Sequence, residues 1–179
     1  QGLPVTADVA IHHVHLIDVD IGYFDPNFRL DPPLRGTRDR DAIIAGLADG
    51  TIDIICSDHA PIGEDDKLLP FGEAEPGASA LETLLPLTLK WATENDIPLT
   101  QALTKVTSGP AEILSKGSAK GRLSVDAKAD VVVFDPSAPW VVSAETLVSA
   151  GKNTPFAGYE LEGCVRYTLV GGEIRYVRS

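Results

Sequence analysis

The segment Ser57–Pro61 (SDHAP) places a carboxylate and an imidazole side by side, at Asp58 and His59, directly after the apolar run Ile52–Cys56. A buried strand that ends in such a pair is a common way for a barrel enzyme to present a metal ligand or a base at the barrel mouth. An acid at the end of a buried strand costs free energy unless it is paired or coordinated. Two interpretations of Asp58 follow. It caps the next turn, or it binds a metal and accepts a proton from the water that the metal activates.

The four histidines of the chain all lie just after one of two predicted strands. His12, His13 and His15 follow the first strand, and His59 follows the second. Imidazole is a common metal ligand, and the spacing of His13 and His15 is similar to that of paired ligands in metallohydrolases. The alternative is that these histidines line a loop and satisfy backbone groups. The spacing by itself leaves both interpretations open.

The two strands that must position these residues are predicted at Val5–Ile11 and Ile52–Cys56. Between them, Thr37–Asp49 predicts a helix with Thr37 as its N-cap and Gly50 as the residue that ends it. Strand, helix and strand in this order form the βαβ pattern of a parallel sheet or barrel. Two strands cannot close a barrel, and a chain that begins with glutamine suggests a piece of a longer protein. We therefore expect the other strands to lie outside this chain.

The segment that follows the second strand predicts a long loop and then a helix. Gly63–Gly77 carries five acidic residues and one lysine, and loops of this length are typically lids, binding loops or flexible segments. Ser79–Asn95 predicts a helix that Pro86 should kink. The apolar side of this helix is predicted to consist of Leu81, Leu84, Leu85, Thr88 and Leu89.

The remainder of the chain changes from a helical to a strand-rich pattern. Two short helices are predicted at Leu99–Val106 and Pro110–Leu114. Three strands follow, the last two joined by the hairpin turn Gly171-Gly172, at Ala129–Phe134, Val165–Val170 and Glu173–Val177. We predict an α/β fold in two parts, a barrel portion over residues 1–115 and a small β unit over residues 116–179.

Composition excludes some classes of partner. The formal charge of −11, from 15 basic and 26 acidic residues, argues against nucleic acid and anionic membranes, which require clustered cations. No run of 18 apolar residues and no signal peptide is visible, so we expect a cytoplasmic protein. Cys56 and Cys164 have no zinc-type spacing and are expected to be free, buried thiols.

Several segments, in order and spacing, resemble the C-terminal half of class I dihydroorotases of the amidohydrolase superfamily. The similarity covers nearly the whole chain, and SDHAP combined with NTPF is its most specific part. Hydantoinases and allantoinases share the general plan but fit KNTPF less well. The matching segments are GLPVTADVAIHH at 2–13, DPPLR at 31–35, DGTIDIICSDHAP at 49–61, ALETLLPL at 80–87, ADVVVFDP at 129–136 and KNTPFAGYELEG at 152–163.

This resemblance implies a (β/α)8 barrel with an attached β-sandwich, in which Val5–Ile11 and Ile52–Cys56 are barrel strands seven and eight. It implies interconversion of N-carbamoyl-L-aspartate and dihydroorotate in pyrimidine biosynthesis, with one or two zinc ions. Asp58 matches the metal-binding aspartate that also acts as general base. His12 and His13 match a pair that is not among the metal ligands, and the family's histidine ligands belong to earlier strands. The implied partners are the upstream half of the barrel and, in a homo-oligomer, further copies of the protein.

Substrate-binding positions of the family differ in this chain. Asp31 stands where the family usually has Asn, and Ile62 where it usually has a substrate-binding His. Glu75-Pro76-Gly77 replaces Pro-Phe-Gly in the lid, so that Pro76 is changed and Gly77 is kept. These differences raise an alternative, a non-catalytic dihydroorotase-like subunit that assembles with aspartate carbamoyltransferase, although Asp58 is retained. For this chain alone we predict no stoichiometric zinc, because one carboxylate cannot supply the three or four ligands of a zinc site.

Overall fold

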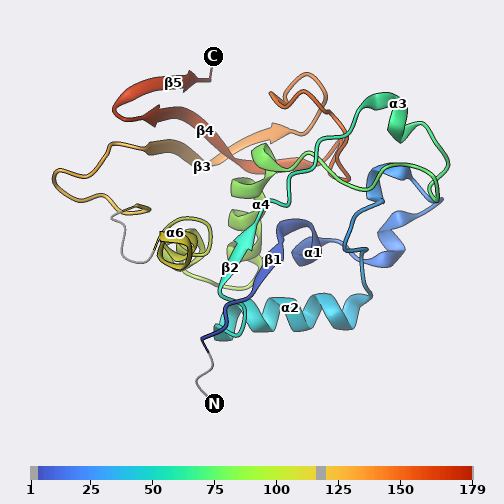
Figure 1. Cartoon of the computed structure of the whole chain (residues 1–179), viewed down its shortest axis with the longest axis horizontal. Helices are drawn as coiled ribbons and strands as arrows, with labels where there is room; N and C mark the ends of the chain where they lie inside the picture. The colour runs from blue at the N-terminus through green and yellow to red at the C-terminus, as the bar shows by residue number, and fades with distance from the viewer. Residues whose placement is uncertain (1–3, 116–119, 179) are drawn as a thin grey trace.

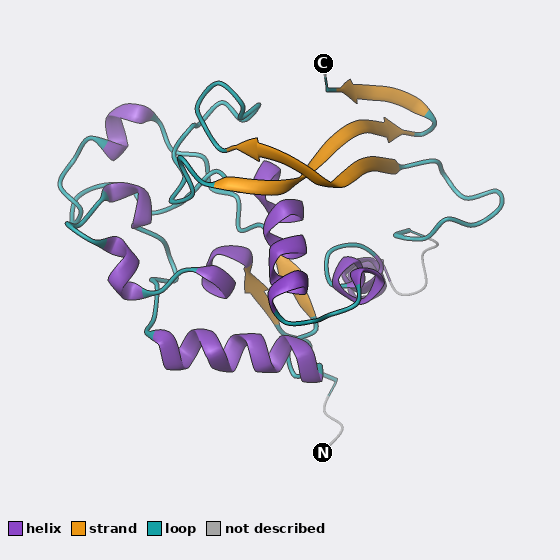
Figure 2. Cartoon of the chain, turned by 180° about the vertical axis from the view of Figure 1, so that it is seen from behind, coloured by secondary structure: helices purple, strands orange, loops and turns teal. Residues whose placement is uncertain are grey.

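The computed structural model describes residues 4–115 and 120–178, which form two small sheets with a long helix between them (Figure 1). Strands β1 (Asp8–Ala10) and β2 (Ile54–Cys56) form a parallel pair. Helix α4 (Leu81–Glu94) packs against the second sheet on one side and against the region of the β1–β2 pair on the other (Figures 1 and 2). Residues 116–119, where the second part of the chain was predicted to begin, lie outside the described residues.

The second sheet is antiparallel, in the order β3 (Val131–Val141), β4 (Glu160–Val170) and β5 (Glu173–Val177). The hairpin turn between β4 and β5 lies at Gly171-Gly172 as predicted, and both glycines have positive φ angles. Strand β3 is longer than predicted. It continues through Pro136 because register shifts after Val133 and Asp135 accommodate residues that would otherwise break the ladder.

The first strand is shorter than predicted. At Ile11 the chain turns into helix α1 (Ile11–His15), and the 3-10 helix η1 (Asp18–Ile21) follows. Ile11 and Val14 are both buried on one face of α1. Their three-residue spacing suits a helical turn against the core, and this tertiary burial overrides the β propensity of the segment.

Helix α2 (Thr37–Asp49) has the predicted bounds, and Gly50 ends it in the left-handed conformation. Its N-cap is Gly36, so the prediction of Thr37 as N-cap is wrong. The long loop after β2 contains one short helix that was not predicted. The other helices of the described chain are η2 (Pro26–Phe28), α3 (Glu64–Lys67), α5 (Leu99–Thr104) and α6 (Ser108–Ser115).

The hydrophobic core surrounds α4, and the buried side of this helix agrees only in part with the predicted one. Leu87 and Trp91 lie in the core with Ile11 and Phe156, whereas Leu81 is 58% exposed. Of the predicted apolar row, Thr88 and Leu89 are buried, whereas Leu81, Leu84 and Leu85 border a cavity of about 530 Å³ between α4 and β3. Pro86 lies inside the helix as predicted. None of the helices in residues 4–115 and 120–178 combines the length and hydrophobicity needed to cross a membrane.

Candidate active site

Asp58 lies two residues beyond the end of β2, in the left-handed region with φ +48°. Aspartate is one of the few residue types other than glycine that tolerate this conformation, and such backbone strain gathers at functional sites. Its side chain is 41% exposed, so the carboxylate is accessible. The described residues contain no group of three or more His, Cys, Asp or Glu side chains arranged to hold a metal. This part of the chain therefore offers one carboxylate and not a complete ligand set.

His12 lies buried behind this carboxylate. Its side chain is 1% exposed, and its Nε2 is 3.6 Å from Oδ2 of Asp58. Neither ring nitrogen has a hydrogen-bond partner within the described structure. Burial and the neighbouring His13 lower the pKa of His12 to about 4, although Asp58 acts in the opposite direction. The imidazole is thus neutral at pH 7, with two ring nitrogens left for Asp58 or for a group bound beside it.

The other three histidines form hydrogen bonds with the backbone. Nε2 of His13 donates to the carbonyl oxygen of Pro32 at 3.0 Å, and Nε2 of His15 donates to that of Leu87 at 2.9 Å. Nδ1 of His59 accepts the backbone N–H of Ala80 at 3.0 Å. These contacts match the interpretation in which the histidines satisfy backbone groups. Only His12 is left without such a partner among the histidines.

Two of the predicted substrate-binding positions are brought together by a residue that was not predicted. Oδ1 of Asn153 accepts the backbone N–H of Ile62 at 2.8 Å, and its Nδ2 donates to the carbonyl oxygen of Gly77 at 3.0 Å. Pro76 is half-buried beside Gly77, and exposed Asp31 precedes the Pro32 carbonyl that His13 contacts. The sequence signal for Asn153 was the KNTPF segment, which served only as a mark of family.

A cavity of about 710 Å³ lies beside these residues, between the loop at residues 61–68 and residues 144–153. Ile62, Lys67 and Asn153 are among its lining residues. Nζ of Lys67 donates to the carbonyl oxygens of Pro26 and Arg29, and burial together with Arg29 lowers the pKa of Lys67. The cavity thus adjoins the predicted substrate-binding positions.

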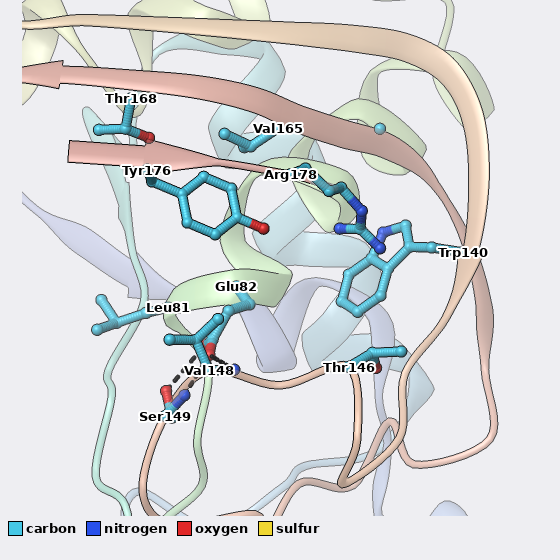
Figure 3. Close-up of a pocket in the computed structure, with 11 residues that line it drawn as sticks. Leu81, Glu82, Trp140, Thr146, Val148, Ser149, Val165, Thr168, Tyr176 and Arg178 are labelled. Atoms are coloured by element: carbon cyan, nitrogen blue, oxygen red, sulfur yellow. Dashed lines mark hydrogen bonds between the residues drawn. The ribbon is translucent and has the colours of Figure 1, made fainter. Parts of the chain in front are cut away.

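A separate cavity of about 420 Å³ lies between the start of α4 and the second sheet (Figure 3). The guanidinium of Arg178 stacks over the Trp140 ring, 5.5 Å from its centroid. The carboxylate of Glu82 accepts hydrogen bonds from Val148 and Ser149 (Figure 3). None of the predicted site residues lines this cavity, and Glu82 is already used to hold the segment after β3.

Known proteins resemble this chain in sequence and in fold. A model of the amidohydrolase family matches residues 1–176. A dihydroorotase of Geobacter sp. (strain M21) is 43% identical over 98% of this chain and 41% of its own length. A dihydroorotase-like protein of Pseudomonas putida is 43% identical over 97% of this chain and 40% of its own length. The chain therefore spans about two-fifths of the length of these relatives.

Among solved structures, an L-hydantoinase (dihydropyrimidinase) from Arthrobacter aurescens superposes with a TM-score of 0.87 at 25% identity, over 98% of this chain and 41% of that one. A D-hydantoinase (dihydropyrimidinase) from Thermus sp. superposes with a TM-score of 0.87 at 25% identity, over 97% of this chain and 39% of that one. Sequence and fold thus agree over nearly all of the chain. The chain belongs to the amidohydrolase family, as a dihydroorotase-like member.

Proposed function

We propose that this chain is part of a dihydroorotase-type zinc cyclic amidohydrolase that interconverts N-carbamoyl-L-aspartate and dihydroorotate in pyrimidine biosynthesis. In this proposal β1 and β2 are barrel strands seven and eight, β3–β5 belong to a β-sandwich, and the rest of the protein supplies the other strands. The main support is the accessible, left-handed Asp58 at the end of β2, in a chain more than 40% identical to proteins named dihydroorotase.

Asp58 has two roles in the proposed reaction. A metal ion held here would supply water activated near neutrality. Asp58 would provide one ligand to the metal and act as the general base that accepts the proton. Buried His12, 3.6 Å away, limits how the carboxylate can turn. Asp31, Ile62, Pro76 and Gly77 are proposed to face the substrate.

The test is dihydroorotate hydrolysis by the whole protein with zinc present. We expect Asp58→Asn to lower kcat by about 10²–10⁴-fold, the range for loss of a general base. Asp126→Asn is the matched control, because Asp126 has the same left-handed backbone at φ +63° but lies in the connector before β3. An Asp58→Asn enzyme with unchanged turnover would contradict the proposal.

Metal analysis tests the zinc assignment independently. After dialysis, the whole protein should retain zinc, and Asp58→Asn should retain less. The 179-residue chain alone should retain no stoichiometric zinc, because Asp58 provides too few ligands. Tight zinc binding by this chain alone would contradict the assignment and make His12, His13 and His15 candidate ligands.

A second candidate function is a non-catalytic dihydroorotase-like subunit that assembles with aspartate carbamoyltransferase. Its support is the similarity to the Pseudomonas putida dihydroorotase-like protein, together with Asp31 and Ile62. A carboxylate at position 31 repels an anionic substrate, and Ile62 removes a donor worth about 1.5–3 kcal/mol when it contacts a charged group. Zinc-loaded whole protein without turnover, which co-purifies with the carbamoyltransferase, would favour this function.

A further inference from the structure

We propose that Asn153 is a positioning residue that fixes two loops, residues 57–63 and residues 73–79, in a single arrangement. The inference relies on the proposed function only for the assignment of Ile62 and Gly77 to the substrate. The contacts themselves are independent of any reaction, so the holding role of Asn153 can be tested without turnover.

The Asn153 side chain contacts each loop through a different atom. Its Oδ1 accepts the backbone N–H of Ile62 at 2.8 Å, and its Nδ2 donates to the carbonyl oxygen of Gly77 at 3.0 Å. The side chain is buried, and the Asn153 backbone carbonyl accepts the N–H of Ser79 at 2.7 Å. A single buried amide therefore joins loops that leave β2 and enter α4.

The segment that carries Asn153 is itself held against both loops. Oγ of Ser79 donates to the carbonyl oxygen of Gly151 at 2.6 Å. A Cβ atom at Gly151 would lie 2.8 Å from Cβ of Pro61 and 2.9 Å from the carbonyl oxygen of Ile62. Only glycine fits at such a separation. The backbone at residues 151–153 thus packs directly on the loop that follows Asp58.

The two loops also contact each other. The backbone N–H of Ala60 donates to the carbonyl oxygen of Ala78 at 2.9 Å. A Cβ atom at Gly77 would lie 2.7 Å from Cβ of Ala60. Because this contact is close, a displacement of the lid end at Gly77 displaces the Asp58 loop. Asn153 is the side chain that bonds to both sides of this contact.

The direct test is residue-resolved amide hydrogen exchange on the 179-residue chain. Asn153→Asp retains an acceptor for Ile62 but cannot donate to Gly77. We expect the Ile62 amide to stay protected while the Gly77 and Ser79 amides exchange about 5- to 100-fold faster, as for loss of one buried hydrogen bond. Asn153→Ala should accelerate exchange at Ile62 as well.

Asn95→Asp is the matched control. Nδ2 of Asn95 donates to the carbonyl oxygen of Trp91 at 2.8 Å, so this variant also loses one amide donor to the backbone. Its effect should remain at the end of α4. If Asn153→Ala does not fold, Ser79→Ala is a milder variant, because it removes the hydroxyl that contacts Gly151 and should accelerate exchange in both loops by less.

Amide hydrogen exchange tests the role of Asn153, whereas turnover by the whole protein tests the proposed function. In the whole protein, Asn153→Asp should raise KM for dihydroorotate at least about fivefold and lower kcat by a smaller factor, since the Ile62 contact and Asp58 are retained. Unchanged exchange at Gly77 and Ser79, or equal acceleration throughout α4, would overturn the inference. If the whole protein has no turnover, the proposed function fails, and exchange alone decides the role of Asn153.

Discussion

Nδ1 of His59 accepts the backbone N–H of Ala80 at 3.0 Å, which ties the SDHAP loop to the start of α4. His59 also forms an isolated parallel bridge with Ala78. Asp58 and His59 are adjacent in the sequence, but their side chains therefore have different roles. His59 is engaged within the fold, while Asp58 keeps its carboxylate accessible.

His59→Leu should destabilise the chain. Without the acceptor, the Ala80 N–H is left unsatisfied in a partly buried position, at a cost of about 1–3 kcal/mol in the free energy of unfolding. His59→Asn places an oxygen near the position of Nδ1 and should recover part of this loss. Urea unfolding of both variants measures the difference, and equal stabilities would contradict the role assigned to Nδ1.

The stability of the chain should decrease on acidification because of His12. Its folded-state pKa of about 4 lies below the ordinary value of 6.5, so between these values the unfolded state binds more protons. The free energy of unfolding should therefore fall by about 3 kcal/mol from this group between pH 7 and pH 4. His12→Gln should reduce the slope without abolishing it, because the pKa of His15 is also lowered, first by burial. Urea unfolding at several pH values measures the slope, and an unchanged slope would contradict the prediction.

Gly77→Ala should be costly, whereas Gly72→Ala in the same long loop should be nearly neutral. Gly77 has φ +136°, and an added Cβ would lie 2.7 Å from Cβ and 2.8 Å from the carbonyl oxygen of Ala60. No heavy atom lies within 4 Å of the corresponding position at Gly72. Strain of this kind costs about 1–3 kcal/mol. Thermal unfolding of both variants provides the comparison, and similar melting temperatures would show that the loop adapts.

The carboxylate of Glu82 accepts hydrogen bonds from the backbone of Val148 and from the backbone and hydroxyl of Ser149. Glu82→Ala removes these bonds and should lower the free energy of unfolding at pH 7 by about 2–3 kcal/mol. Glu94→Ala on the same helix should cost less than about 1 kcal/mol, since it removes an exposed ion pair with Lys90 and only a long contact, 4.0 Å, with Nδ1 of His15.

The effect of Glu82→Ala should also depend on pH. Burial raises the pKa of Glu82, but the hydrogen bonds to its carboxylate, from Ser149 first and also from Val148, together leave the pKa below 4.5. A lowered folded-state pKa stabilises the fold above pH 4.5, and this contribution is lost as the pH falls through the folded-state value. The difference between wild type and Glu82→Ala in urea unfolding should shrink on acidification below pH 4.5. A difference independent of pH would contradict the role of the charged carboxylate.

The sequence by itself predicted the features that depend on local pattern. The bounds of α2 and the Gly171-Gly172 hairpin were confirmed. The parallel pairing of β1 with β2 was also confirmed, although it followed from the order strand, helix, strand and not from a local pattern. Helical periodicity, a glycine at a helix end and a two-residue turn act over a few neighbouring residues, so they can be recognised without knowledge of the rest of the fold.

Only the tertiary structure decided which side of α4 is buried and which histidine lacks a partner. Leu81 is exposed while Leu87 and Trp91 are buried, because α4 is packed by α1 and β4 from distant parts of the chain. Asn153 and Ile62 are 91 positions apart, and no spacing rule connects them. Hydrogen bonds of this kind form only when packing brings separate loops together, so the sequence determined the family and the position of Asp58, and the fold determined what surrounds it.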